Sequence, residues 1–253
     1  MKVYIITYCT SPESLYGNLL TLGSIRTGFP GAEIIVVHNS VAKECRSQLA
    51  EAAEKVGAAS RYVENVSHAS IILQIMSSHY ADEDSIVILD PDIIFWEDCS
   101  GWDFGGKLAG RLLPRFFDEY SGCDTVERIH TSFLWVDNPR RLVNSLIAPA
   151  KKHFELKLVE PFMFRLDGKM LRYDTLAGLY HFLPSAMSPF TEEHLDCYDH
   201  IFCGTHKAAI KDTFSELTKV HEAVKKGNLG SLRGIWREQQ RFFVGQGDCN
   251  EPR

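Results

Sequence analysis

Two aspartates held one residue apart by a proline follow an apolar run in the segment SIVILDPDIIFWED, residues 85–98. Four apolar residues lead into Asp90-Pro91-Asp92, and three more come directly after it. Apolar flanks on both sides predict carboxylates at the edge of a core, where an unpaired charge costs several kcal/mol. Carboxylate oxygens suit Mg²⁺ or Mn²⁺, which keep open positions for water and phosphate oxygens. Asp90 and Asp92 are therefore predicted to bind one of these divalent cations.

A different chemistry that uses a D-x-D pattern is that of phosphatases whose first Asp is the nucleophile. That motif normally follows the first strand of its fold and has Thr or Val two residues after the second Asp. Here the pattern follows the fourth predicted strand, and residue 94 is Ile. The placement favours a metal-binding role over a nucleophilic one.

The elements that must position these carboxylates alternate between strand and helix. Strands are predicted at residues 2–8, 32–40, 60–66 and 85–90, the first of them buried and the third short, and helices at 10–28, 41–57 and 67–81. Gly28 and Gly57 are expected to end the first two helices. This order predicts an α/β fold with a Rossmann-like, doubly wound, mostly parallel sheet flanked by helices. Ligands of such folds bind at the carboxyl ends of the strands, where Asp90 and Asp92 are expected.

The alternation changes after residue 98. The patterns predict strands at 106–114 and 130–138, the second mixed into the sheet, helices at 139–153 and 173–183, a strand or loop at 200–205, and helices at 207–226 and near 230–243. We expect a catalytic domain at 1–206, made of a nucleotide-binding half (1–98) and an acceptor half (99–206). A basic helical extension (207–245) and a flexible tail (246–253) are expected to follow.

The charge of the chain is unevenly distributed. The formal net charge is −6, yet residues 140–172 hold eight Lys/Arg against three Asp/Glu, and residues 207–241 hold eight against four. Two interpretations are open, because such stretches are either solvated helix faces or a basic side near a phosphate-bearing ligand. The net charge itself gives no reason to expect a polyanionic partner.

Cysteine usage and hydropathy bear on the compartment. The seven cysteines are odd in number and form no C-x-x-C pair, and no secretory signal pattern opens the chain. We therefore expect free thiols in a reducing, cytoplasmic location. No apolar run approaches the length of a transmembrane helix, so no membrane span is predicted.

Four pieces of the sequence together resemble the metal-dependent nucleotide-sugar glycosyltransferases of the A-type fold (GT-A). They are YIITYCTSPE near the N-terminus, VILDPDIIF, the block from HTSFLWVDN to YDTLAGLYHFL, and HIFCGTH. The resemblance spans roughly the first 207 residues, and the D-x-D with the late His-x-x-x-Gly is more specific than either piece alone. It implies a GT-A fold and transfer of a sugar from a nucleotide donor.

The resemblance also implies roles for residues around the diphosphate. Asp90 and Asp92 would bind the metal and the nucleotide, and His200 would complete the metal site, with His206 as the competing ligand. Gly204 and Thr205 would approach the phosphates, since glycine lets backbone N–H groups come close.

Four residues match positions near the nucleotide base. Thr7 and Tyr8 end the first strand, and Tyr8 could stack on the base or form a hydrogen bond to it; packing at the strand end is the alternative. Asn39 stands where many relatives have an acid, and its amide could pair with a uracil edge. His68 opens the third helix, where it would touch base or ribose or would be a surface histidine.

Inverting sugar transfer needs a group that takes the acceptor proton. The resemblance implies Asp174 as this base, with helix capping as the alternative for an Asp at that place. His130, with Thr131 and Ser132, would lie where donor sugar and acceptor meet. Trp135 would form a sugar platform or belong to the core.

These expectations combine into one function with alternatives. The chain is expected to be a metal-dependent hexosyl- or pentosyltransferase that uses a nucleotide-sugar donor, a UDP-sugar in the first place, and Mn²⁺ or Mg²⁺. The acceptor is a hydroxyl of open class, and the basic 207–241 stretch suits a phosphate-rich one. The alternatives are a nucleotidyltransferase that makes the nucleotide sugar, and transfer to a hydroxymethylated DNA base rather than a glycan.

Overall fold

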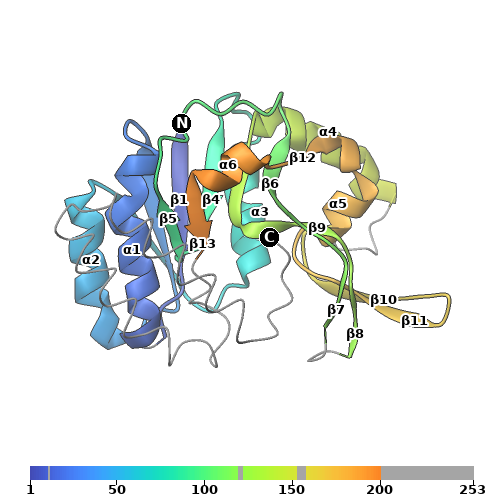
Figure 1. The fold of residues 1–253 in the computed structure, drawn as a ribbon, viewed down its shortest axis with the longest axis horizontal. Coiled ribbons are helices and arrows are strands. Elements are labelled where there is room, and N and C mark those ends of the chain that lie inside the picture. The colour runs from blue at the N-terminus through green and yellow to red at the C-terminus, as the bar shows by residue number, and fades with distance from the viewer. Residues whose placement is uncertain (11, 119–121, 153–157, 201–253) are drawn as a thin grey trace.

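The fold is built around one mixed seven-stranded sheet (Figure 1). The structure is a computed structural model, and it describes residues 1–10, 12–118, 122–152 and 158–200. The strand order is β12-β6-β9-β4-β1-β2-β3. The strands are β1 (Lys2–Thr7), β2 (Glu33–Asn39), β3 (Ala59–Val63), β4 (Ile86–Leu89), β6 (Leu108–Leu113), β9 (Arg128–Val136) and β12 (Met187–Pro189).

Strand directions confirm the predicted fold class. β1 pairs in parallel with β2 and with β4, and β2 pairs in parallel with β3. β9 runs antiparallel to both of its neighbours, β4 and β6. The sheet is therefore mostly parallel, with the mixed strand where the sequence predicts it.

Helices cover both faces of this sheet. They are α1 (Pro12–Gly28), α2 (Arg46–Lys55), α3 (His68–Ser78), α4 (Pro139–Lys152), α5 (Ala177–Phe182) and α6 (Glu192–Asp196). Alternate residues of β1 belong to different cores: Val3 and Ile5 pack with α1 and α2, whereas Tyr4 and Ile6 pack with α3 and α5. A strand buried on both sides has no polar face, which explains its continuous apolar sequence.

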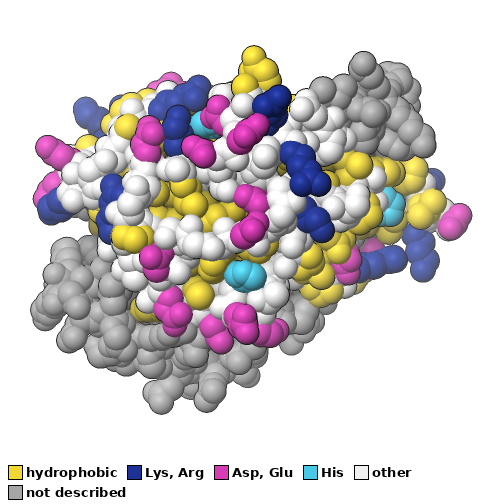
Figure 2. All heavy atoms as spheres, turned by 90° about the horizontal axis from the view of Figure 1, so that it is seen from above, with side chains coloured by type: hydrophobic (Ala, Val, Ile, Leu, Met, Phe, Trp, Pro, Cys, Tyr) yellow, Lys and Arg dark blue, Asp and Glu magenta, His cyan; other side chains and the backbone are white. Residues whose placement is uncertain are grey.

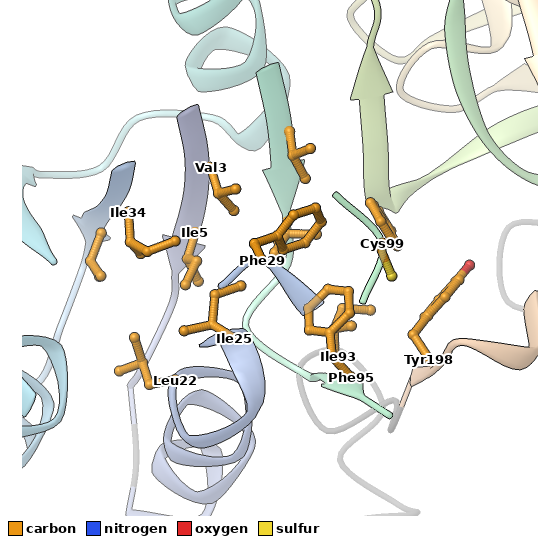
Figure 3. Close-up of a cluster of buried hydrophobic side chains, with 14 of the residues drawn as sticks. Val3, Ile5, Leu22, Ile25, Phe29, Ile34, Ile93, Phe95, Cys99 and Tyr198 are labelled. Atoms are coloured by element: carbon orange, nitrogen blue, oxygen red, sulfur yellow. The ribbon is translucent and has the colours of Figure 1, made fainter. Parts of the chain in front are cut away.

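Two smaller sheets complete the fold. One has the order β10-β11-β8-β7 and the other pairs β13 with β5. Their strands are β5 (Ile93–Phe95), β7 (Phe116–Asp118), β8 (Cys123–Thr125), β10 (Phe162–Leu166), β11 (Lys169–Tyr173) and β13 (Tyr198–His200). Figure 3 shows apolar side chains from the end of α1, from β5 and from β13 gathered in one cluster.

Several element predictions are wrong in detail. The helix expected at 173–183 begins only at Ala177, because Lys169–Tyr173 is a strand. The helix expected at 41–57 opens with a 3₁₀ turn, Lys43–Cys45, before α2. None of the four strands in the sheet β10-β11-β8-β7 was expected.

Three of the predictions concern the C-terminal part of the chain. The extension at 207–245, the tail at 246–253 and the division of the domain at residue 206 lie outside the described residues.

Figure 2 looks onto the end of the molecule where β1 begins, and acidic and basic side chains are interspersed there. Among the described residues, no helix is long and apolar enough to cross a membrane.

Candidate functional site

A short antiparallel pairing brings a histidine to the two aspartates. β13 pairs with β5 so that His200 stands opposite Ile93, the residue that follows Asp92. The indole N–H of Trp96 donates a 2.6 Å hydrogen bond to Oδ2 of Asp199, which ties the two strands together. The pairing therefore places His200 beside Asp92 from a distant part of the chain.

Helix α1 supports β5 from its other side. Oγ1 of Thr21 accepts the N–H of Ile93 at 2.9 Å, and Oγ of Ser24 accepts the N–H of Phe95 at 3.1 Å. Gly28 lies against the Phe95 ring, where an added Cβ would be 2.5 Å from a ring carbon. Two hydroxyls and a glycine thus let a three-residue strand lie on a helix without leaving its N–H groups unsatisfied.

Asp90, Asp92 and His200 form a cluster that suits a cation. One ligand atom from each of the three lies within 4.8 Å of the others. Nε2 of His200 is 3.1 Å from Oδ1 of Asp92, and both side chains are less than a tenth exposed. An ion of the size of Mg²⁺ holds its ligands at about 2.1 Å, so opposite ligands are about 4.2 Å apart. Small side-chain shifts would close this cluster around such an ion.

His68 contacts the first aspartate of the pair. It is the first residue of α3, and its Nε2 lies 2.9 Å from Oδ1 of Asp90. Burial alone would lower the pKa of His68, but the charge and hydrogen bond of Asp90, with smaller contributions from Asp174 and Asp92, raise it above its ordinary value. His68 therefore belongs to the acidic cluster and is not an isolated surface histidine.

Strand β9 forms the opposite wall of the cluster. The backbone N–H of Asp90 donates to the carbonyl of Ser132 at 2.7 Å, and Nδ1 of His130 is 2.7 Å from Oγ of Ser132. The His130 and His200 rings are 5.1 Å apart between centroids. Burial, then His200 and Arg128, hold the pKa of His130 well below its ordinary value. Its burial and these neighbours therefore favour the neutral form of the imidazole.

Asp174 is held by a buried arginine. Its Oδ2 lies 3.3 Å from a guanidinium nitrogen of Arg128, whose side chain is 8% exposed and whose guanidinium lies 5.6 Å from the centre of the Phe116 ring. The helix-capping alternative for Asp174 is wrong, because the N-cap of α5 is Leu176. The acidic cluster and this ion pair share one neighbourhood, since Asp174 contributes to the raised pKa of His68.

The residues predicted to meet the nucleotide base have differing surroundings. Thr7 is fully buried, and its hydroxyl donates to the carbonyl of Val37, whereas Tyr8 is 49% exposed. The amide of Asn39 pairs with the main chain of Val66 through both its nitrogen and its oxygen. Of these residues, Tyr8 presents an exposed ring, while Asn39 would have to release Val66 to pair with a base.

Other sequence-predicted residues lie elsewhere. Trp135 is fully buried in the core, so the sugar-platform alternative is wrong. Gly204, Thr205 and His206 lie outside the described residues. Thr131 follows His130 on β9 and is partly exposed.

Two arginines near the cluster escaped the sequence analysis. Arg128 opens β9, and Arg111 lies on β6; both contribute to the lowered pKa of His130. For Arg128 the available signal was a cation at the start of a predominantly buried strand, in ERIHTSFLWV. A buried cation needs a nearby anion, and Asp174 is that anion.

Comparisons with known proteins identify the fold. No protein family model and no curated protein sequence matches the chain. Among solved structures, the galactosyltransferase LgtC, in complex with donor and acceptor sugar analogues, matches with a TM-score of 0.50 at 10% identity, over 88% of this chain and 96% of that chain. This is the GT-A fold. At such low identity the likeness defines the fold and not the reaction.

More distant structures include a second transferase and a nucleotidyltransferase-like enzyme. The mannosyltransferase PcManGT of Pyrobaculum calidifontis, in complex with GDP-Man and Mn²⁺, gives a TM-score of 0.38 at 16% identity over 58% of this chain and 46% of that chain. The 4-diphosphocytidyl-2C-methyl-D-erythritol synthase of Anaerococcus prevotii gives 0.47 at 13% identity over 86% and 96%.

Proposed function

We propose that the protein is a glycosyltransferase that moves a sugar from a nucleoside-diphosphate sugar, a UDP-sugar in the first place, to an acceptor hydroxyl. The observation that carries the proposal is the convergence of Asp90, Asp92 and His200 beyond the carboxyl end of β4 in a GT-A fold. In open α/β sheets that edge is where ligands bind. Two acids and an imidazole meeting there suit a cation that also contacts a diphosphate.

The three ligands would hold Mn²⁺ or Mg²⁺. Two carboxylates fit either ion, and the imidazole of His200 favours Mn²⁺, because nitrogen ligands suit transition metals better than Mg²⁺. A bound ion would neutralise charge on the leaving nucleoside diphosphate. His68 would keep Asp90 in place through their 2.9 Å contact.

The donor nucleotide would lie over the ends of β1 and β4. Tyr8 would stack on the base, since its ring is exposed beside the buried Thr7. The amide of Asn39 would bind a uracil edge only after leaving Val66. Gly204 and Thr205 are proposed to approach the phosphates.

The acceptor would approach from the side of β9 and β11. If transfer inverts the sugar, Asp174 is the proposed base, oriented by Arg128 at 3.3 Å. His130 is the second proposed base, since its ring lies beside the cluster, 5.1 Å from that of His200. Either group would take the acceptor proton as the hydroxyl attacks the sugar carbon and the bond to the diphosphate breaks.

The test is a panel of nucleotide sugars measured by thermal shift with and without Mn²⁺. A ligand that binds the native state raises the melting temperature, so we expect one donor to do so only with the metal. Hydrolysis of that donor to nucleoside diphosphate would support transfer. If no donor shifts the protein, and pyrophosphate is instead released from a nucleoside triphosphate and a sugar phosphate, the nucleotidyltransferase alternative replaces the proposal.

A further inference from the structure

A two-stranded hairpin projects from the body of the protein (Figure 1). It consists of β10 and β11, joined at Asp167 and Gly168. Both turn residues have positive φ, 50° and 79°, which is the two-residue turn that matches the twist of a hairpin. The base of the hairpin packs on the protein through Leu171 and Tyr173, which cluster with Val126 and with Ala177 of α5.

Large apolar side chains are exposed on both faces of this hairpin, and Arg165 and Arg172 share the face of Met163 and Met170. The register puts Phe164 and Leu166 on one face and Met163 and Met170 on the other. These four side chains are 40%, 50%, 49% and 38% exposed. With Phe117 on β7, at the other edge of the same sheet, they make five of the nine large apolar side chains that are exposed among the described residues. An antiparallel sheet that is half buried has a polar face toward water, so apolar side chains exposed on both faces of the hairpin indicate an interaction site.

The charge of the hairpin opposes that of the whole chain. Between residues 162 and 173, Arg165, Lys169 and Arg172 stand against Asp167. The segment is thus positive in a chain whose formal net charge is −6. An anionic surface would repel the rest of the protein and attract this part, so charge would orient the molecule with the hairpin toward that surface.

We propose that the β10–β11 hairpin docks the protein on an anionic lipid surface. A bilayer interface surrounds an inserted element, so it accepts apolar side chains on both faces of a ribbon, whereas a protein groove would have to enclose it. Phe, Leu and Met would enter the boundary between headgroups and acyl chains, and the Arg and Lys side chains would meet lipid phosphates. Nucleic acid fits less well, because bases stack on aromatic rings and three of these four side chains are aliphatic.

Docking would also fix the distance between the candidate site and the lipid surface. β11 runs from the turn to Tyr173, the residue before Asp174. A strand advances about 3.3 Å per residue, so the six positions from Gly168 to Asp174 put that carboxylate about 20 Å from the hairpin tip. The proposal does not depend on the transferase assignment, since the hairpin would dock whatever reaction the site performs.

The test uses the full chain and vesicles in a flotation assay. We expect binding to phosphatidylcholine vesicles that contain phosphatidylglycerol and little binding to phosphatidylcholine alone. The double variant Phe164→Ser/Leu166→Ser should bind about tenfold more weakly, because it removes the two largest inserted side chains. The matched control is Leu73→Ser/Tyr80→Ser, which removes two exposed apolar side chains from the surface around α3 and should bind like the wild type.

Two further variants separate insertion from charge. Arg165→Glu/Lys169→Glu should weaken binding about fivefold or more per charge and reduce its salt dependence. In Phe164→Trp, vesicles should shift the added fluorescence to the blue, and lipids brominated on the acyl chain should quench it. Equal binding of the Phe164/Leu166 variant and wild type, no quenching in Phe164→Trp, or binding of single-stranded oligonucleotide in place of vesicles would each overturn the proposal.

Discussion

Asp92 and His200 face each other in surroundings that exclude most water, and this makes Asp92 the residue on which the proposed metal site depends. We predict that Asp92→Asn abolishes Mn²⁺-dependent stabilisation by the donor nucleotide, because the amide keeps the shape but not the charge. The melting temperature without metal should be unchanged or higher, since a buried carboxylate costs desolvation energy. Thermal shift with UDP, with and without Mn²⁺, measures both effects.

The control for this variant is Asp84→Asn, which removes an exposed carboxylate near the start of β4. It should leave the metal-dependent stabilisation as in the wild type. Unchanged affinity of Asp92→Asn for UDP in the presence of Mn²⁺ would refute the metal-site assignment.

Asp174 has an ion-pair partner, and this changes what its substitution should do. If Asp174 is the base, Asp174→Asn should lower kcat by roughly 10²–10⁴ while donor affinity holds. The variant also removes the carboxylate charge that lies 3.3 Å from the buried Arg128 guanidinium, which should cost up to about 3 kcal/mol of stability. Turnover at saturating donor, paired with thermal denaturation, distinguishes the two effects.

A second Asp–Arg pair provides the comparison. Asp124 pairs with Arg115 in the small four-stranded sheet, where Arg115 is exposed. Asp124→Asn should change stability by less than about 1 kcal/mol and leave turnover unchanged. Wild-type turnover in Asp174→Asn would exclude Asp174 as the base and make a retaining mechanism, or His130, the better account.

At the scale of elements, the contact between α1 and β5 determines where Asp92 stands. A methyl group at Gly28 would overlap the Phe95 ring, with 2.5 Å between the added Cβ and a ring carbon. Gly28→Ala should therefore destabilise the protein by about 1–3 kcal/mol, as overpacked cores do. It should also weaken Mn²⁺ binding, because β5 carries the chain directly on from Asp92. Denaturant unfolding and metal titration are the measurements.

Gly31 provides a control for this variant. No atom lies within 4 Å of a Cβ added there, and its backbone needs no left-handed conformation. Gly31→Ala should leave both stability and metal affinity nearly unchanged. Equal effects of the two substitutions would show that the packing of Gly28 on Phe95 does not matter.

The same elements show which parts of the fold could be predicted from the sequence. Continuous apolar strands and helices with clear ends made the order from β1 to β4 predictable, and with it the place of Asp90 and Asp92. Gly28 ends α1 as predicted, and among the described contacts the Phe95 ring is what requires glycine there, because a Cβ would overlap it. Gly57 instead has the positive φ of a left-handed helix cap, 66°. Local sequence patterns therefore predicted where the helices end, but they did not predict the contact that requires glycine at residue 28.

Long-range pairing and short strands were harder to predict. β5 and β13 have three residues each, too few for a periodic pattern, so the resemblance and not periodicity pointed to His200. The hairpin did carry a signal, the Asp167-Gly168 pair, but FMFRL before it lacks the alternation of a half-buried strand. Asp174 was expected to start a helix because the hairpin was missed.

At the scale of the whole molecule, the basic stretch at 207–226 is the remaining sequence feature with a predicted role. Glu substitutions of its Lys residues should raise the KM for an anionic acceptor and flatten its salt dependence, since fewer positive charges attract it. Donor hydrolysis should hardly change. Kinetics at several salt concentrations test this, and a parallel loss of both activities would assign the stretch to the donor site.

The pairing of β13 with β5 also has a consequence for how the protein is made. The hydrogen bond that joins these strands links Trp96 and Asp199, 103 positions apart. During synthesis the chain emerges from its N-terminus, so β1 to β4 and both aspartates leave the ribosome well before His200. Contacts between such distant segments form late, because closing a long loop costs entropy before the contact repays it. The proposed metal site should therefore be completed late, and chains stalled before residue 200 should carry both aspartates without completing it.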